Sequence, residues 1–130
     1  LLGGDGWDSP KLYEIGGSAL EGTYFSNHYS SEDKSPHVQA FIAKFKEKFG
    51  VVPDGLAAMG YDAAKVLIDA MGRSPSLEKS AIREALANTK EYQGVTGKIT
   101  IDANRNAVKP AVVLKVDKGG EFKYVTTINP

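Results

Sequence analysis

One acidic residue near the amino end has neighbours that suit the binding of a small cation. Asp5 lies in the run Gly3-Gly4-Asp5-Gly6-Trp7, directly after Leu1-Leu2, which reads as the end of a strand. Ligands of open α/β sheets bind beyond the carboxyl ends of strands, where a carboxylate can accept charge-assisted hydrogen bonds from an ammonium group. Gly6 allows close approach of a ligand, and Trp7 can supply an apolar wall or a cation–π face. From these residues alone, an Asx-turn that ends the strand explains Asp5 equally well.

The motifs of other chemistries are incomplete in this sequence. The glycines around Asp5 lack the spacing of a dinucleotide fingerprint, and Gly94–Lys98 has too few residues between its glycines for a phosphate loop. The run Asp102–Asn106 resembles the start of a calcium loop, but Ala107 and Val113 stand where glycine and glutamate are needed. No serine lies in a Gly-x-Ser-x-Gly elbow, although a triad assembled by the fold stays open. We therefore predict no catalytic residue, no metal site and no cofactor.

The histidines and the paired acidic residues offer no clear site either. His28 and His37 have no carboxylate or second histidine at metal-ligand spacing, so each is predicted to lie at the surface or at a strand edge. Glu32-Asp33 falls in a polar connection and is interpreted as solvated charge. Asp5 therefore remains the strongest candidate.

The apolar pattern predicts the elements that position these side chains. Ser9-Pro10 and Ser35-Pro36 are typical helix starts, and Asp54 caps a further helix that is apolar on most sides and is predicted to be buried between layers. Period-two alternation near the carboxyl end indicates strands, the last two forming a hairpin. We expect an α/β fold with antiparallel strands at the C-terminal end. The predicted helices cover about 10–16, 36–49, 55–71 and 77–88, and the predicted strands 22–29, 98–102, 111–116 and 121–127.

Composition narrows the classes of partner. The chain has 130 residues, which suits one domain, and a formal net charge of zero, which argues against nucleic acid as a partner. No apolar run approaches the roughly 18 to 20 residues that span a bilayer, so we expect no direct membrane insertion. Leu1–Gly4 lacks the basic and apolar regions of a signal peptide, and the absence of cysteine excludes disulfides and thiolate metal sites.

Several short stretches, taken together and in order, carry a resemblance to a known family. The chain resembles the C-terminal third of the periplasmic leucine/isoleucine/valine-binding proteins, which have the type I solute-binding fold. The resemblance covers essentially the whole chain, and its stretches are Leu1–Trp7, Leu20–Tyr24, His37–Phe41 with Phe45 and Phe49, Gly60–Ala64, Ile82–Leu86, Gly94–Ile99 and Pro110–Val113.

The resemblance implies a part of a two-lobed, three-layer protein that closes on its ligand. Residues 1–130 would be the C-terminal portion, with 1–26 in one lobe, a crossing near Asn27–Asp33, and 35–130 mostly in the other lobe. Asp5 would bind the ligand's α-ammonium group, although many relatives have glutamate there. Leu56 or a neighbour would line the pocket, smaller than the aromatic residue often found. The groups that bind the ligand's carboxylate would lie in the part that this chain does not contain.

The predicted function is the non-catalytic binding of a small amino acid, branched-chain or similar, for delivery to the membrane permease of an ABC-type importer. Asp5, Gly6, Trp7 and Leu56 are the predicted ligand-binding residues. The resemblance implies a periplasmic or extracellular location, with a lipid anchor in a Gram-positive bacterium. We also expect pairing with the missing N-terminal portion or with a second copy, because isolated apolar faces need cover. Three alternatives stay open: an excised or engineered structural module, a ligand-sensing domain of a receptor, and an enzyme on a flavodoxin-like sheet.

Overall fold

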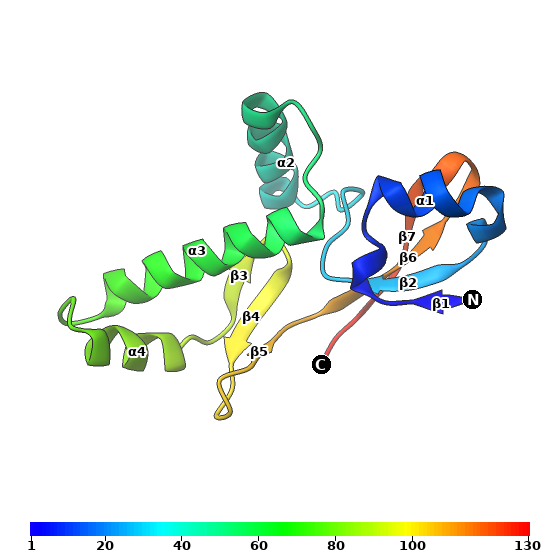
Figure 1. The fold of residues 1–130 in the computed structure, drawn as a ribbon. Coiled ribbons are helices and arrows are strands. Elements are labelled where there is room, and N and C mark those ends of the chain that lie inside the picture. Colours follow the sequence, from blue (N-terminus) through cyan, green and yellow to red (C-terminus); the bar gives the residue numbers. More distant parts are fainter.

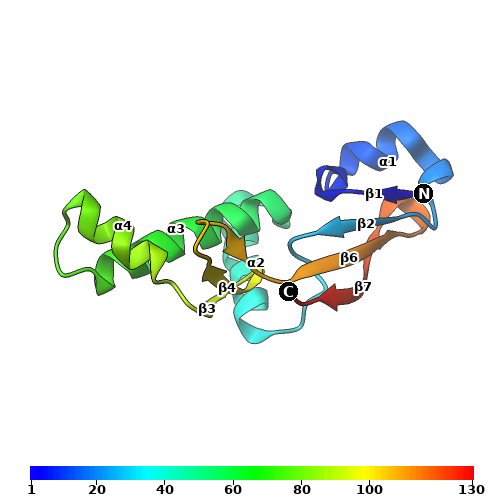
Figure 2. The ribbon, with the colours of Figure 1, turned by 90° about the horizontal axis from the view of Figure 1, so that it is seen from below.

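The computed structural model describes all 130 residues and divides into two bodies that lie side by side (Figure 1). The first, which we call the four-stranded body, contains the two ends of the chain. The second, the helical body, contains the middle. Figure 2 shows the long helix of the helical body pointing away from the four-stranded body, so contact between the two is confined to one region. No helix combines the length and the apolar character needed to cross a membrane.

The four-stranded body is a mixed sheet with order β1-β2-β6-β7. The β1–β2 pair is parallel and the other pairs are antiparallel, with a register irregularity between Val113 and Leu114. Strands β6 and β7 form the predicted hairpin, closed by the short turn η3. The elements are β1 (Leu2–Gly3), η1 (Asp5–Trp7), α1 (Pro10–Gly16), η2 (Gly17–Leu20), β2 (Tyr24–Asn27), β6 (Ala111–Val116), η3 (Lys118–Gly120) and β7 (Phe122–Ile128).

The helical body consists of three helices and a small three-stranded sheet of order β3-β4-β5. All four predicted helices are present, with bounds within about two residues of those expected. Strands β3 and β5 were not predicted, because two or three residues are too short to show a period. The elements are α2 (Pro36–Phe49), α3 (Gly55–Arg73), α4 (Lys79–Ala87), β3 (Tyr92–Gly94), β4 (Gly97–Ile101) and β5 (Ala107–Val108).

Each body has its own apolar core. Phe25 and Leu114 are register partners at the centre of the first core, and the Phe122 ring packs edge-on to Phe25 with centroids 4.9 Å apart. The second core forms where the start of α3 meets α2 and the β3–β4 turn. Its buried members are Tyr29, Val38, Phe41, Ala58 and Val95. The two cores are separate clusters, one in each body.

Helix α3 is buried on one face only, which corrects the prediction that it lies between layers. Ala58, Val66 and Ala70 are buried, whereas Leu56 and Ile68 are 72% and 61% exposed. Helix α4 and strand β3 pack against the buried face. Near the start of α3 the Phe41 ring of α2 also packs against Tyr61, with centroids 4.8 Å apart. Leu56, Leu67 and Ile68 stay exposed to solvent.

Candidate ligand-binding site

A cavity of about 300 Å³ lies where the two bodies meet. The four-stranded body contributes residues from η1, from the turn before α1 and from the end of β2. The helical body contributes the first turns of α3. Three of the four predicted ligand-binding residues line this cavity, although the sequence separates Leu56 widely from Asp5 and Gly6. The full lining is Asp5, Gly6, Asp8, Ser9, Asn27, Asp54, Gly55, Leu56 and Met59.

Asp5 reaches the cavity because the chain turns sharply after β1. Strand β1 ends at Gly3, and the next residues form the 3₁₀ turn η1, in which the Trp7 N–H donates to the Gly4 carbonyl at 3.0 Å. The Asp5 side chain is 59% exposed, and its one side-chain partner is the His28 ring. An exposed carboxylate at a strand end can therefore accept hydrogen bonds from a ligand.

Trp7 does not line this cavity. Its ring packs against the core of the four-stranded body, with its centroid 6.3 Å from that of Phe25. A Cβ atom on Gly3 would lie 2.3 Å from the Trp7 ring, so the turn requires glycine there. Trp7 thus supports the turn that carries Asp5, and its predicted role in ligand binding stays a prediction.

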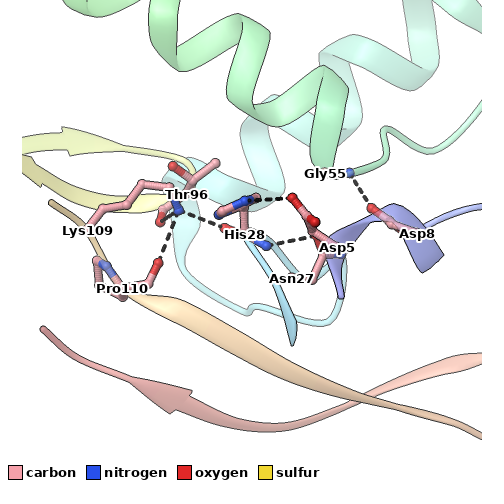
Figure 3. Close-up of polar contacts among 8 residues, drawn as sticks. All are labelled: Asp5, Asp8, Asn27, His28, Gly55, Thr96, Lys109 and Pro110. Carbon is pink, nitrogen blue, oxygen red and sulfur yellow. Dashed lines mark hydrogen bonds and ion pairs between the residues drawn. The ribbon is translucent and has the colours of Figure 1, made fainter. Parts of the chain in front are cut away.

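Two carboxylates meet the amino end of helix α3. The Asp54 Oδ1 atom caps the helix by accepting from the Ala57 N–H at 2.8 Å, as predicted for that residue. Asp8, from the four-stranded body, accepts from the Gly55 N–H at 2.5 Å. Helix amino ends carry partial positive charge, so both carboxylates are placed favourably. The Asp8–Gly55 hydrogen bond joins the two bodies, and both of its residues line the cavity (Figure 3).

Sequence reasoning missed the role of Asp8. Its partner lies 47 residues further along the chain, and nothing local marks it as a bridge. The one signal available was an acidic residue close to the predicted strand end, in the same segment as Asp5.

Gly55 lies close to the four-stranded body, and a larger residue there should disturb the contact. A Cβ atom at this position would lie 2.7 Å from Asn27 Oδ1 and 2.9 Å from Asp8 Oδ2. Because Asn27 is buried, Gly55→Ala is expected to lower the free energy of unfolding by about 1–3 kcal/mol, measured by urea denaturation. Gly60→Ala, on the same helix with open space around it, is the matched control and should raise stability by about 0.5–1 kcal/mol. Equal effects of the two variants would contradict this account.

The charges around the cavity favour a cationic group. Asp5, Asp8 and Asp54 line it, and no lysine or arginine does. No group of three or more histidine, cysteine, aspartate or glutamate side chains is arranged to hold a metal ion. An organic ammonium group, which needs acceptors without a fixed coordination geometry, fits this wall better than a metal.

Lys109 ties together the segments that pass between the bodies. Its Nζ atom donates to the carbonyls of Pro110 at 3.1 Å, Thr96 at 3.4 Å and His28 at 3.5 Å (Figure 3). Burial lowers the pKa of the Lys109 ammonium group, and the charge of Asp62 acts in the opposite direction. Lys109 thus links the three segments that contain His28, Thr96 and Pro110 through their carbonyl groups, without a direct ion pair.

A larger cavity of about 450 Å³ lies against the same crossing segments but contains none of the four predicted residues. Tyr29 lines it, and the buried Tyr29 hydroxyl has no hydrogen-bond partner. Burial raises the pKa of this hydroxyl. Glu32, also in the lining, is already engaged, because the Tyr124 N–H donates to it at 2.7 Å and lowers its pKa. The larger cavity is therefore not the better site for an ammonium group, in spite of its volume.

Comparison with known proteins gives a consistent result. The family model described as "Periplasmic binding protein" matches residues 1–121. A Leu/Ile/Val-binding protein homolog 2 of Brucella abortus is 26% identical over 126 residues, which are 95% of this chain and 33% of the relative. The chain thus spans about a third of the length of the curated relatives that it matches.

Solved structures match over nearly the whole chain. A leucine-binding protein, LivK, from Thermotoga maritima is 42% identical, with a TM-score of 0.88 over 99% of this chain and 37% of that protein. The substrate-binding protein LivJ from Streptococcus pneumoniae, solved with isoleucine, is 27% identical, with a TM-score of 0.84 and the same coverage. The expected α/β fold of the type I solute-binding proteins is therefore confirmed.

Proposed function

The chain belongs to the periplasmic binding protein family, and we propose that it is the C-terminal portion of a two-lobed protein that binds a small amino acid without altering it. The observation that carries this proposal is the cavity between the bodies, which is lined by both Asp5 and Leu56. Delivery of the ligand to the permease of an ABC-type importer, and a periplasmic or extracellular location, belong to the same proposal. The family match supports both.

In this proposal the Asp5 carboxylate accepts hydrogen bonds from the ligand's ammonium group. Leu56 and Met59 lie one helical turn apart at the start of α3 and offer apolar contact to an aliphatic side chain. The high exposure of Leu56 leaves its side chain free for that contact. Asp5, Asp8 and Asp54 would repel the ligand's carboxylate, so the groups that bind it belong outside this chain.

We further propose that the two bodies belong to the two lobes. Residues 1–26 lie in the four-stranded body, and most of 35–130 lies in the helical body, while β6 and β7 return to pair beside β2. The chain passes between the bodies over residues 28–35 and again next to Lys109. These passages would act as the hinge when the lobes close. The exposed apolar face of α3 would be covered by the remaining portion of the protein or by a second copy.

Branched-chain amino acids are the proposed ligands. The Thermotoga maritima relative is described as a leucine-binding protein, and the Streptococcus pneumoniae structure contains isoleucine. A cavity wall with two aliphatic side chains and an excess of negative charge suits a ligand that is apolar at one end and cationic at the other.

Titration calorimetry tests this function. The chain alone, and the chain completed with the remaining two thirds, should be titrated with leucine, isoleucine, valine, an aromatic amino acid and 4-methylpentanoate, which lacks the amino group. We expect the complete protein to bind the aliphatic amino acids and not 4-methylpentanoate. Tight binding of 4-methylpentanoate, or no binding of any amino acid, would overturn the proposal.

The same titration separates a second candidate function. If the complete protein binds and the chain alone does not, the chain acts as a structural module that needs its partner for function. The exposed apolar residues of α3 favour this outcome, because they lack a covering layer in the isolated chain.

A further inference from the structure

His28 is the side chain that contacts Asp5 at the rim of the cavity. It follows the last residue of β2, and its Nε2 atom lies 3.1 Å from Asp5 Oδ2 (Figure 3). The ring comes from the passage between the bodies, whereas Asp5 comes from η1. Spacing along the chain gave no sign of this pair, since the two residues are 23 positions apart.

The backbone of His28 is held on two sides. Its N–H donates to Asn27 Oδ1 at 2.8 Å, and its carbonyl accepts from Lys109 Nζ at 3.5 Å. Asn27 is itself buried. The imidazole ring is therefore attached to a fixed point, while the Asp5 side chain is more exposed and has no other side-chain partner.

We propose that His28 is a positioning residue, which orients the Asp5 carboxylate toward the ammonium group of the ligand. This inference rests on the function proposed above. A carboxylate only accepts hydrogen bonds, so the neutral ring places its proton on Nε2 and donates to Oδ2. This bond restricts the rotamers of an exposed side chain and leaves Oδ1 open to the ligand. Less conformational entropy is then lost when the ligand binds.

The arrangement also makes ligand binding depend on the charge of the ring. A protonated imidazole is a second cation beside the same carboxylate, so it competes with the ammonium group. Histidine is the side chain that ordinarily changes charge between about pH 5 and 8. The other charged groups near the ring are Lys109 at the His28 carbonyl, Glu32, Asp33 and Lys34 in the adjoining cavity, and Asp8 and Asp54 in the ligand cavity.

Two substitutions separate orientation from competition. His28→Gln keeps an N–H donor without a titrating ring, and His28→Phe removes the donor. His37→Gln is the matched control, because His37 is exposed on α2 and does not line the ligand cavity. Circular dichroism and urea unfolding of each variant establish that it is folded. Leucine affinity is then measured by calorimetry at about pH 8 and about pH 5.5 on the complete protein.

At about pH 8 we expect His28→Phe to bind leucine roughly fivefold more weakly and His28→Gln to stay within about twofold of the wild type. On acidification the wild type and His37→Gln should lose roughly fivefold in affinity, as expected for two like charges a few ångströms apart near water. Neither His28 variant should show this loss.

A second readout is the number of protons that leucine binding releases. Linkage requires that binding of the ammonium group expels the proton from the ring, so leucine binding at about pH 6.5 should release protons. Calorimetry in buffers of different ionisation enthalpy measures this release, which should vanish in His28→Gln. If the wild type binds leucine without proton release and with the same affinity as His28→Phe, the proposed role of His28 is overturned. The proposed function is not affected by that result. A wild type that binds no amino acid at either pH overturns the proposed function and this inference with it.

Discussion

Asp5→Asn is expected to weaken leucine binding by about a hundredfold in the complete protein. Asparagine keeps the size of the side chain but loses the negative charge and turns one acceptor into a donor. Truncating one partner of a hydrogen-bonded charge pair costs about 2–5 kcal/mol, and about 2.7 kcal/mol corresponds to a hundredfold change in Kd. Equilibrium titration with leucine measures the change.

The substituted protein should remain folded, because the Asp5 side chain is largely exposed and bonds only to His28. Glu14→Gln is a suitable control, since it removes an exposed carboxylate on α1 that does not line the cavity. Leucine binding should be unchanged in that variant. If Asp5→Asn binds leucine within about threefold of the wild type, the ammonium group is bound elsewhere and the site is wrongly placed.

Asp62→Ala is expected to have the largest effect on stability. Asp62 is only 3% exposed, at the middle of α3. Its Oδ1 atom accepts from the Val95 N–H, and its Oδ2 atom accepts from the N–H and the hydroxyl of Thr96, all at 2.8 Å. These bonds fix the β3–β4 turn onto the helix. A Cβ atom on Gly94 would lie 2.5 Å from Asp62 Oδ2, so the turn follows the carboxylate closely.

Removing this carboxylate leaves two buried backbone N–H groups without an acceptor. Each buried unpaired group costs about 1–3 kcal/mol, so Asp62→Ala should lower the free energy of unfolding by about 3–5 kcal/mol. Urea denaturation followed by circular dichroism measures the loss. Asp69→Asn on the same helix is the control, because its pair with Arg73 is partly exposed and such pairs contribute about 1 kcal/mol or less. A loss of less than about 1 kcal/mol in Asp62→Ala would show that the turn is held by other contacts.

The exposed apolar face of α3 should affect the stability of the isolated chain. Leu56, Leu67 and Ile68 are exposed in this chain, and the relatives are about three times as long. In the proposed two-lobed protein, part of this face is covered by sequence outside the chain. Stability measured on the complete protein and on the chain alone should therefore differ, and the comparison of each variant with its control should use one of the two throughout.

The sequence by itself determined the local elements of this protein. Helix α1 begins at a serine cap followed by proline, and α3 begins at the Asp54 cap. The period of the apolar residues predicted α2 and the closing hairpin of β6 and β7. These features depend on neighbours within one or two turns of the chain, so their signals are local. Placing Leu56 beside Asp5 needed the family resemblance, since no periodicity relates the two residues.

Only the tertiary structure decided which side chains surround the cavity. Asp8 bridges to Gly55, His28 contacts Asp5, and Trp7 turns into the core instead of the cavity. Each of these outcomes depends on how two separate segments pack, and a residue's own neighbours in the chain carry no information about a partner in a distant segment. Burial was misjudged on α3 for a related reason: an apolar face predicts that a covering layer is needed, but not whether the same chain supplies it.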